Sequence, residues 1–222
     1  AYFGGCNFLS AGKAGDAGHA QVWPDDNPYY RAQEGAVTIE QPVGADGSGW
    51  EPADWDTRCL DRTATPPRTV AATATDYGTG NRVSISGGEG EVDPATGDGR
   101  ITWEGSFTVV FYGGMTYWWV SDPVLTIKDD TGTLTATAGG FGASMEDLTK
   151  WEALPEQTIT LATIPDVATS GSTGLEATPA YAGVRVGTGS GSAQATDVEG
   201  WGSFPQDFVD FWLITRVAHF IA

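Results

Sequence analysis

From residue 81 onward, hydrophobic and polar side chains alternate along the chain, and this alternation predicts β-strands. The stretches 81–93 and 100–112 flank the turn PATGDG, and we expect 100–112 to form one long strand because it alternates β-branched and aromatic residues with others. After Gly113-Gly114, residues 115–129 and 133–140 continue the pattern around the turn DDTG. Short turns between successive strands predict an antiparallel meander of three or four strands.

The alternation resumes after the meander. Residues 157–164 predict a further strand, and residues 174–187 alternate again. The Gly-, Ser- and Ala-rich stretch 187–200 is interpreted as a loop within the domain, because too little chain follows it to form another core.

Two segments favour short helices. Ser144–Leu154 begins with Ser, Glu and Asp, which can cap a helix, and an irregular crossing is the alternative. Near the end, the spacing of Phe208, Phe211 and Trp212 predicts a helical turn that runs into a strand at Leu213–Ile221.

The first 80 residues are punctuated by Pro and Gly, which predicts long loops around a few short strands, with Gly35–Gln41 among them. We find no repeat of solenoid period and no second core. Residues 1–222 are therefore predicted to form one domain of the all-β class, mainly antiparallel. We expect a two-layered β-sandwich with long loops and one or two short helices.

Three consecutive aromatic residues, Tyr117, Trp118 and Trp119, lie in the middle of the predicted meander. Neighbouring side chains of a strand point to opposite faces, so Trp118 and Trp119 cannot enter the same core. With one indole in the core, Tyr117 and Trp119 would share the other face. Such a pair could line a flat ligand or form the centre of a protein interface.

The charge of the chain limits its partners. There are 29 acidic and 11 basic residues, a formal net charge of −18, which disfavours nucleic acid and anionic membrane surfaces. The chain contains no apolar run long enough to span a membrane and no signal peptide at Ala1. We therefore expect a mature exported protein.

The two cysteines, Cys6 and Cys59, both lie in irregular sequence, where a cross-link is most useful. As a disulfide they would stabilise the fold by about 4 kcal/mol through the restriction of the unfolded chain. The alternative is two unrelated buried thiols. A disulfide would indicate an oxidising, extracytoplasmic location.

Catalytic signatures are missing from the sequence. Only two histidines are present, no His or Cys pair has metal-site spacing, and no nucleophile elbow or phosphate-binding loop occurs. Asp54 and Asp56, near Trp50 and Trp55, are the best carboxylates for a glycosidase, but we interpret them as solvated loop residues. We expect no enzymatic activity and no metal site.

The sequence resembles the HtaA domain, the haem-uptake module of corynebacteria and related actinobacteria. The segments that carry the resemblance are GSFTVVFYGG (105–114), SDPVLTI (121–127), TGTLTATAG (131–139), AYAGV (180–184), GWGSFPQDFVDFW (200–212) and, more loosely, YFGGCNFLSAGKAGDAG (2–18). The resemblance implies a secreted or surface-anchored β-domain that holds haem between loops. Family members bind the ferric iron through a tyrosinate, assisted by a histidine and a further tyrosine near the C-terminal end.

The three positions of that ligand shell differ in this chain. The family's histidine follows the first of these strands, where this chain has Gly113-Gly114-Met115. The iron-binding tyrosine falls at or close to Cys6, and the closing aromatic motif is replaced by His219-Phe220-Ile221.

With these positions altered, our first hypothesis is a non-enzymatic exported protein of the cell envelope that acts as a structural or protein-interaction module. Trp118 and Trp119 would supply the aromatic surface for a partner protein or for self-association. The Cys6–Cys59 disulfide would replace the order that bound haem gives to the loops.

Two alternatives remain. The first is a haem-binding or haem-relay protein of an iron-uptake system, in which Tyr112, Tyr117 and His219 are the candidate haem-binding residues. The second is a glycan- or glycolipid-binding module that uses four tryptophans, namely Trp50, Trp55, Trp118 and Trp119.

Overall fold

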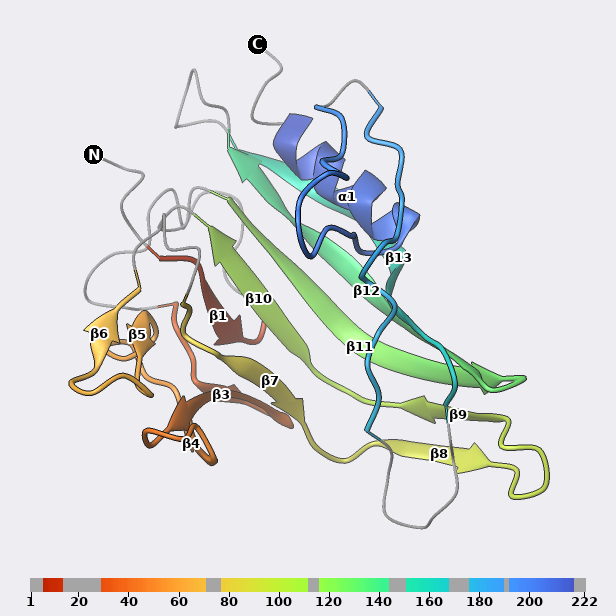
Figure 1. Cartoon of the computed structure of the whole chain (residues 1–222), viewed down its shortest axis with the longest axis horizontal. Helices are drawn as coiled ribbons and strands as arrows, with labels where there is room; N and C mark the ends of the chain where they lie inside the picture. The colour runs from red at the N-terminus through yellow and green to blue at the C-terminus, as the bar shows by residue number, and fades with distance from the viewer. Residues whose placement is uncertain are drawn as a thin grey trace.

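The computed structural model describes residues 6–13, 29–70, 77–111, 116–143, 151–167, 176–189 and 192–217 (Figure 1). Almost all of their regular structure is antiparallel β-sheet, so the predicted all-β class is confirmed. Within these ranges no helix is both long enough and apolar enough to cross a membrane.

The main sheet has seven strands: β1 (Phe8–Ala11), β8 (Glu89–Val92), β9 (Gly99–Thr102), β10 (Ser106–Phe111), β11 (Thr116–Lys128), β12 (Thr131–Ala143) and β13 (Trp151–Ile164). They pair in the order β1-β10-β11-β12-β13, and β9 pairs with both β8 and β11. The predicted meander is therefore confirmed, with β11 and β12 as its long central hairpin.

Smaller elements flank this sheet. A four-stranded sheet contains β2 (Gln33–Glu34), β3 (Val37–Val43), β4 (Gly49–Pro52) and β7 (Arg82–Ile85), and a two-stranded sheet contains β5 (Leu60–Asp61) and β6 (Arg68–Thr69). The helix α1 (Gln206–Val217) lies over β12 and β13, away from these small sheets (Figure 1).

The predicted single strand at 100–112 is divided into β9 and β10, a correction with a local cause. Gly105 has φ +140°, which favours glycine, and its N–H donates to the Asp122 carboxylate at 3.1 Å. Asp122 itself has φ +53°, and its N–H donates to the Gly105 carbonyl at 2.8 Å. The pairing of β11 with β12 also shifts between Ser121 and Val124. The break at Gly105 and the irregularity in β11 therefore lie at the same level of the sheet.

Three further expectations are corrected. Ser144–Lys150 lie outside the described residues, but the rest of the candidate helix, Trp151–Leu154, begins β13. The alternating stretch 174–187 forms no strand in its described part, residues 176–187, where Ala182 makes an isolated bridge to Gly202. At the end of the chain, the helix continues to Val217 where a strand was expected, and the remainder lies outside the described residues.

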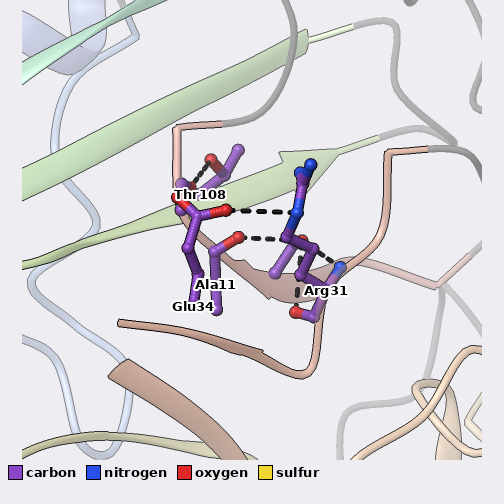
Figure 2. Close-up of polar contacts among 6 residues, drawn as sticks. Ala11, Arg31, Glu34 and Thr108 are labelled. Atoms are coloured by element: carbon purple, nitrogen blue, oxygen red, sulfur yellow. Dashed lines mark hydrogen bonds and ion pairs between the residues drawn. The ribbon is translucent and has the colours of Figure 1, made fainter. Parts of the chain in front are cut away.

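Polar contacts tie the short edge strand β1 to its surroundings (Figure 2). The Ala11 N–H donates to the Arg31 carbonyl at 2.8 Å, and the Arg31 N–H donates to the Ser10 hydroxyl at 3.0 Å. On the other side, the buried Thr108 hydroxyl of β10 donates to the Gly12 carbonyl at 2.6 Å. Arg31 also pairs with Glu34 at 3.1 Å, so these bonds fix the approach of β2 to β1.

The expected Cys6–Cys59 disulfide is present, with 5.7 Å between the two Cα atoms. It joins the residues just before β1 to the loop that precedes β5, across a sequence separation of 53 residues. Closing a loop of this size restricts the unfolded chain by about 4 kcal/mol. The N-terminal strand is thereby held against the small sheets covalently.

Gly140 offers a test of how closely β11 and β12 approach each other. A Cβ at this position would lie 2.6 Å from the Tyr117 carbonyl oxygen and 2.7 Å from the Trp118 Cα, both in the backbone. We expect Gly140→Ala to lower the free energy of unfolding in urea by about 1–3 kcal/mol. Gly78→Ala is the matched control, because a Cβ there has no neighbour within 4 Å. Equal stability of the two variants would contradict this packing.

Candidate functional site

The two faces of β11 are covered by different parts of the chain. Trp118 belongs to a core cluster that includes Phe208 and Phe211 of α1, and its ring meets theirs edge-on at centroid distances of 5.5 and 6.1 Å. Trp119 belongs to a separate cluster with Cys6 and Phe141. The two tryptophans therefore point to opposite faces, as the sequence predicts.

The expectation that one of these faces is an exposed aromatic surface is wrong. Trp118 is 7% exposed, Trp119 is 8% exposed and Tyr117 is fully buried. The physical reason is the N-terminal part of the chain, whose half-buried Tyr30 and Trp55 pack against the cluster of Tyr117 and Trp119. Trp118 and Trp119 are therefore core residues on the two faces of β11, and neither is exposed to a partner.

A cavity of about 730 Å³ lies between the main sheet and α1. Its sheet wall includes Phe107 and Val109 of β10 and Trp118 of β11. Its helix wall includes Phe208 and Trp212. Because successive residues of a strand alternate between faces, Phe107, Val109 and Trp118 reach the cavity from the side of the sheet opposite to Trp119.

The third wall is an irregular segment, the described residues of 181–204, which we call the strap. Its contacts with the cavity include Tyr181, Val186 and Phe204. Phe204 is exposed, at 44%, and stacks on Phe208 with 4.5 Å between the ring centroids. The strap thus forms one wall of a partly open cavity, with side chains and backbone that form no strand.

Two glutamine side chains hold the strap in place. The Gln194 amide accepts a hydrogen bond from Val186 N–H at 3.1 Å and donates to the carbonyls of Val184 and Gly202. The Gln206 amide accepts from Gly187 N–H at 2.7 Å and donates to the Gly187 carbonyl at 2.9 Å. Each side chain therefore satisfies backbone groups that a neighbouring strand would otherwise satisfy.

The strap and α1 also cover part of the edge of β13. The Asp207 carboxylate accepts a hydrogen bond from Thr160 N–H at 2.7 Å. Ala180, which directly precedes the strap, donates its N–H to the Thr163 carbonyl at 2.8 Å, and the Tyr181 hydroxyl of the strap donates to the Leu161 carbonyl at 3.0 Å. These bonds fix the floor of the cavity at the point where α1 begins.

The lining of the cavity is almost entirely apolar. Apart from the indole N–H groups of Trp118 and Trp212, its polar side chains are Tyr181, Thr188, Gln194 and Ser203, all on the strap, and none of the described lining residues is charged. Burial raises the pKa of the Tyr181 phenol, which therefore stays protonated at neutral pH. The cavity can bind an apolar molecule, but its described lining supplies no ionised metal ligand.

Of the three haem candidates, the structure describes Tyr117, which does not line this cavity. Tyr117 is fully buried on the opposite face of the sheet, with its ring 5.6 Å from that of Phe141. Tyr112 and His219 lie outside the described residues. Their assignment stays a prediction.

The aromatic residues proposed for glycan binding are largely occupied. The guanidinium of Arg82 lies 3.6 Å from the ring centre of Trp50, and that of Arg58 lies 3.3 Å from the ring centre of Trp55. Asp54 caps a turn by accepting a hydrogen bond from Thr57 N–H at 2.7 Å. Across the described ranges, no three His, Cys, Asp or Glu side chains are grouped to hold a metal ion.

No protein-family model and no curated protein match the chain. Among solved structures, it is similar to the domain-swapped dimer of a histidine-to-alanine variant of the C-terminal domain of HtaA from Corynebacterium glutamicum. The sequence identity is 18% and the TM-score is 0.31, over 40% of this chain and 49% of that one. The match spans about half the length of that domain, and membership of its family stays a proposal.

The Tyr181 hydroxyl provides a test of the cavity floor. Tyr181→Phe removes the bond to the Leu161 carbonyl and should cost about 1 kcal/mol of unfolding free energy at pH 7. Because the pKa is raised in the folded state, this contribution is present below about pH 10 and is lost as the pH rises through the folded-state pKa. Urea unfolding at pH 7 and pH 11 measures both values. If the difference in unfolding free energy between the wild type and Tyr181→Phe is as large at pH 11 as at pH 7, this role of the Tyr181 hydroxyl is contradicted.

Proposed function

We propose that the chain is a non-enzymatic binding domain of an exported protein, and that it binds an apolar small molecule in the cavity between α1 and the main sheet. The observation that carries the proposal is a cavity of about 730 Å³ with an almost wholly apolar lining. Ligand sites in proteins are usually cavities of about 300–1,000 Å³ with few polar groups.

The walls of this cavity support binding without a large rearrangement. Two walls are regular elements, since β10 and β11 form one side and α1 the other. Binding of an apolar ligand is favourable because it removes the apolar surface of the cavity from water. A preformed site also avoids much of the cost of ordering its side chains.

The proposed location is extracytoplasmic. The Cys6–Cys59 disulfide supports it, because such cross-links persist in oxidising compartments. The HtaA-like envelope role that the sequence favoured is part of the same proposal. Its interaction surface, however, cannot be Trp118 and Trp119, because both are buried.

Binding of the neutral dye Nile red tests the proposal. We expect a saturable, one-to-one increase in fluorescence with the wild-type chain, and at least tenfold weaker binding with Val186→Trp, which fills the cavity. Val184→Trp is the matched control, because Val184 lies on the same strap but does not line the cavity. Circular dichroism of each variant verifies folding. If Val186→Trp binds as tightly as Val184→Trp, the dye does not occupy this cavity.

Haem is the second candidate ligand, favoured by the resemblance of the sequence to the HtaA domain. For this function, a haemin titration should give a sharp and saturable Soret band. The band should be lost in one of Tyr112→Phe, Tyr117→Phe or His219→Ala, which would identify the residue on the iron. A band that does not exceed that of a non-specific control protein would eliminate haem as the ligand.

A further inference from the structure

The cavity is elongated along the strands of the main sheet. On β11, its wall begins at Trp118, and Leu134 of β12, which also lines the cavity, pairs with Leu125 of β11. The eight residues from Trp118 to Leu125, with seven steps between them, span roughly 20 Å at the usual rise of a strand. A long, narrow molecule therefore fits this space better than a disc.

The two ends of the cavity differ in chemistry. One end is formed by Phe111, Trp118 and Trp212, with the rings of Phe111 and Trp212 only 5.0 Å apart. At this end the Trp118 indole N–H is buried and has no hydrogen-bond partner among the described residues. The three aromatic rings make this end apolar and suited to hydrocarbon, whereas the unpaired indole N–H is a donor that would favour a hydrogen-bond acceptor.

The opposite end lies where α1 begins and carries the polar groups of the strap. Ser203 is joined to Tyr181 there through its backbone N–H, and Tyr181 is bonded to Leu161. The hydroxyls of Ser203 and Thr188 make no hydrogen bond within the part of the chain that the structure describes. Two hydroxyl groups are therefore available to a polar group of a ligand.

The charges around this polar end are acidic. Asp207 and Asp210 lie in the first turns of α1, and the described lining contains no Lys or Arg. The guanidinium of the nearby strap residue Arg185 lies over the ring of Trp201, at 5.0 Å. An anionic head group would gain no ion pair from the described lining, so an uncharged head is favoured.

We propose that the ligand is a single-chain amphiphile with an uncharged, oxygen-bearing head, such as a fatty alcohol or a monoacylglycerol. The inference rests on the proposed function and names the ligand class of the same cavity. The hydrocarbon chain lies along β10 and β11 toward Phe111 and Trp212. The head accepts or donates hydrogen bonds at the Ser203 and Thr188 hydroxyls.

Displacement of Nile red by 1-alkanols of 8 to 16 carbons, each below its solubility limit, measures the length of the site. We expect the affinity to rise about fourfold per methylene, the value for full transfer out of water. The rise stops when the chain reaches the aromatic end of the cavity. An affinity that does not depend on chain length overturns the inference.

Two variants locate the chain within the cavity. Val109→Phe fills the aromatic end, so the increase should stop at a shorter alkanol while the shortest alkanols bind as before. Phe111→Leu enlarges that end and should move the stop to a longer alkanol, which provides a second test if Val109→Phe does not fold. An unchanged stopping length in the folded variants overturns the proposed orientation.

The head group is tested with matched pairs of the same chain length. We expect an alcohol to bind more tightly than the carboxylate at pH 7, and Ser203→Ala with Thr188→Val to weaken every alkanol by the same factor. Tighter binding of the carboxylate overturns the uncharged head. If Nile red binds in the cavity but no alkanol displaces it, this inference fails and the proposed function stands. If Nile red does not bind in the cavity, the proposed function itself fails.

Discussion

The structure depends on one constraint: strand β11 has large aromatic side chains on both faces, and both faces must be removed from water. Burial of a single tryptophan removes on the order of 200 Å² from solvent, which is worth about 5 kcal/mol. Trp118 therefore requires a cover on one side and Trp119 a cover on the other. The chain supplies α1 with the strap for the first and its N-terminal segments for the second.

The two covers are held by different kinds of bond. On the Trp119 side, the Cys6–Cys59 disulfide and the hydrogen bonds of Ser10 and Thr108 fix β1 and its neighbours tightly. On the Trp118 side, the strap forms no strand, and the side chains of Gln194 and Gln206 bond to some of its backbone groups. A segment held at a few points cannot follow the surface of a sheet closely, and this explains why the cavity lies on the helix side.

The alternation of side chains was enough to predict the meander, because a strand pattern with short turns has few other solutions. It failed at Val184 and Val186, which alternate like a strand, because the Gln194 side chain takes the hydrogen bonds that a strand would need. It also failed on the exposure of Trp119, because the covering residues Tyr30 and Trp55 come from irregular sequence far away in the chain.

The cavity itself could not be predicted, since an unfilled volume depends on how separate elements meet. A partial signal existed in β10, where Phe107, Val109 and Phe111 are apolar on one face while Val110 is apolar on the other, which implies two covering layers.

The difference between the covers also decides where a ligand can enter at low cost. A molecule beside Tyr117 must displace a fully buried ring in a layer that a disulfide holds closed. A molecule under α1 fills existing space, and admitting it requires at most the exchange of a few side-chain hydrogen bonds, each worth about 1 kcal/mol. A ligand that binds only the folded chain stabilises it by mass action. Occupation of the cavity would therefore stabilise the cover formed by α1 and the strap, as the disulfide stabilises the cover on the Trp119 side. The asymmetry of the two covers therefore makes the helix side of β11 the side on which the proposed binding would disturb the fold least.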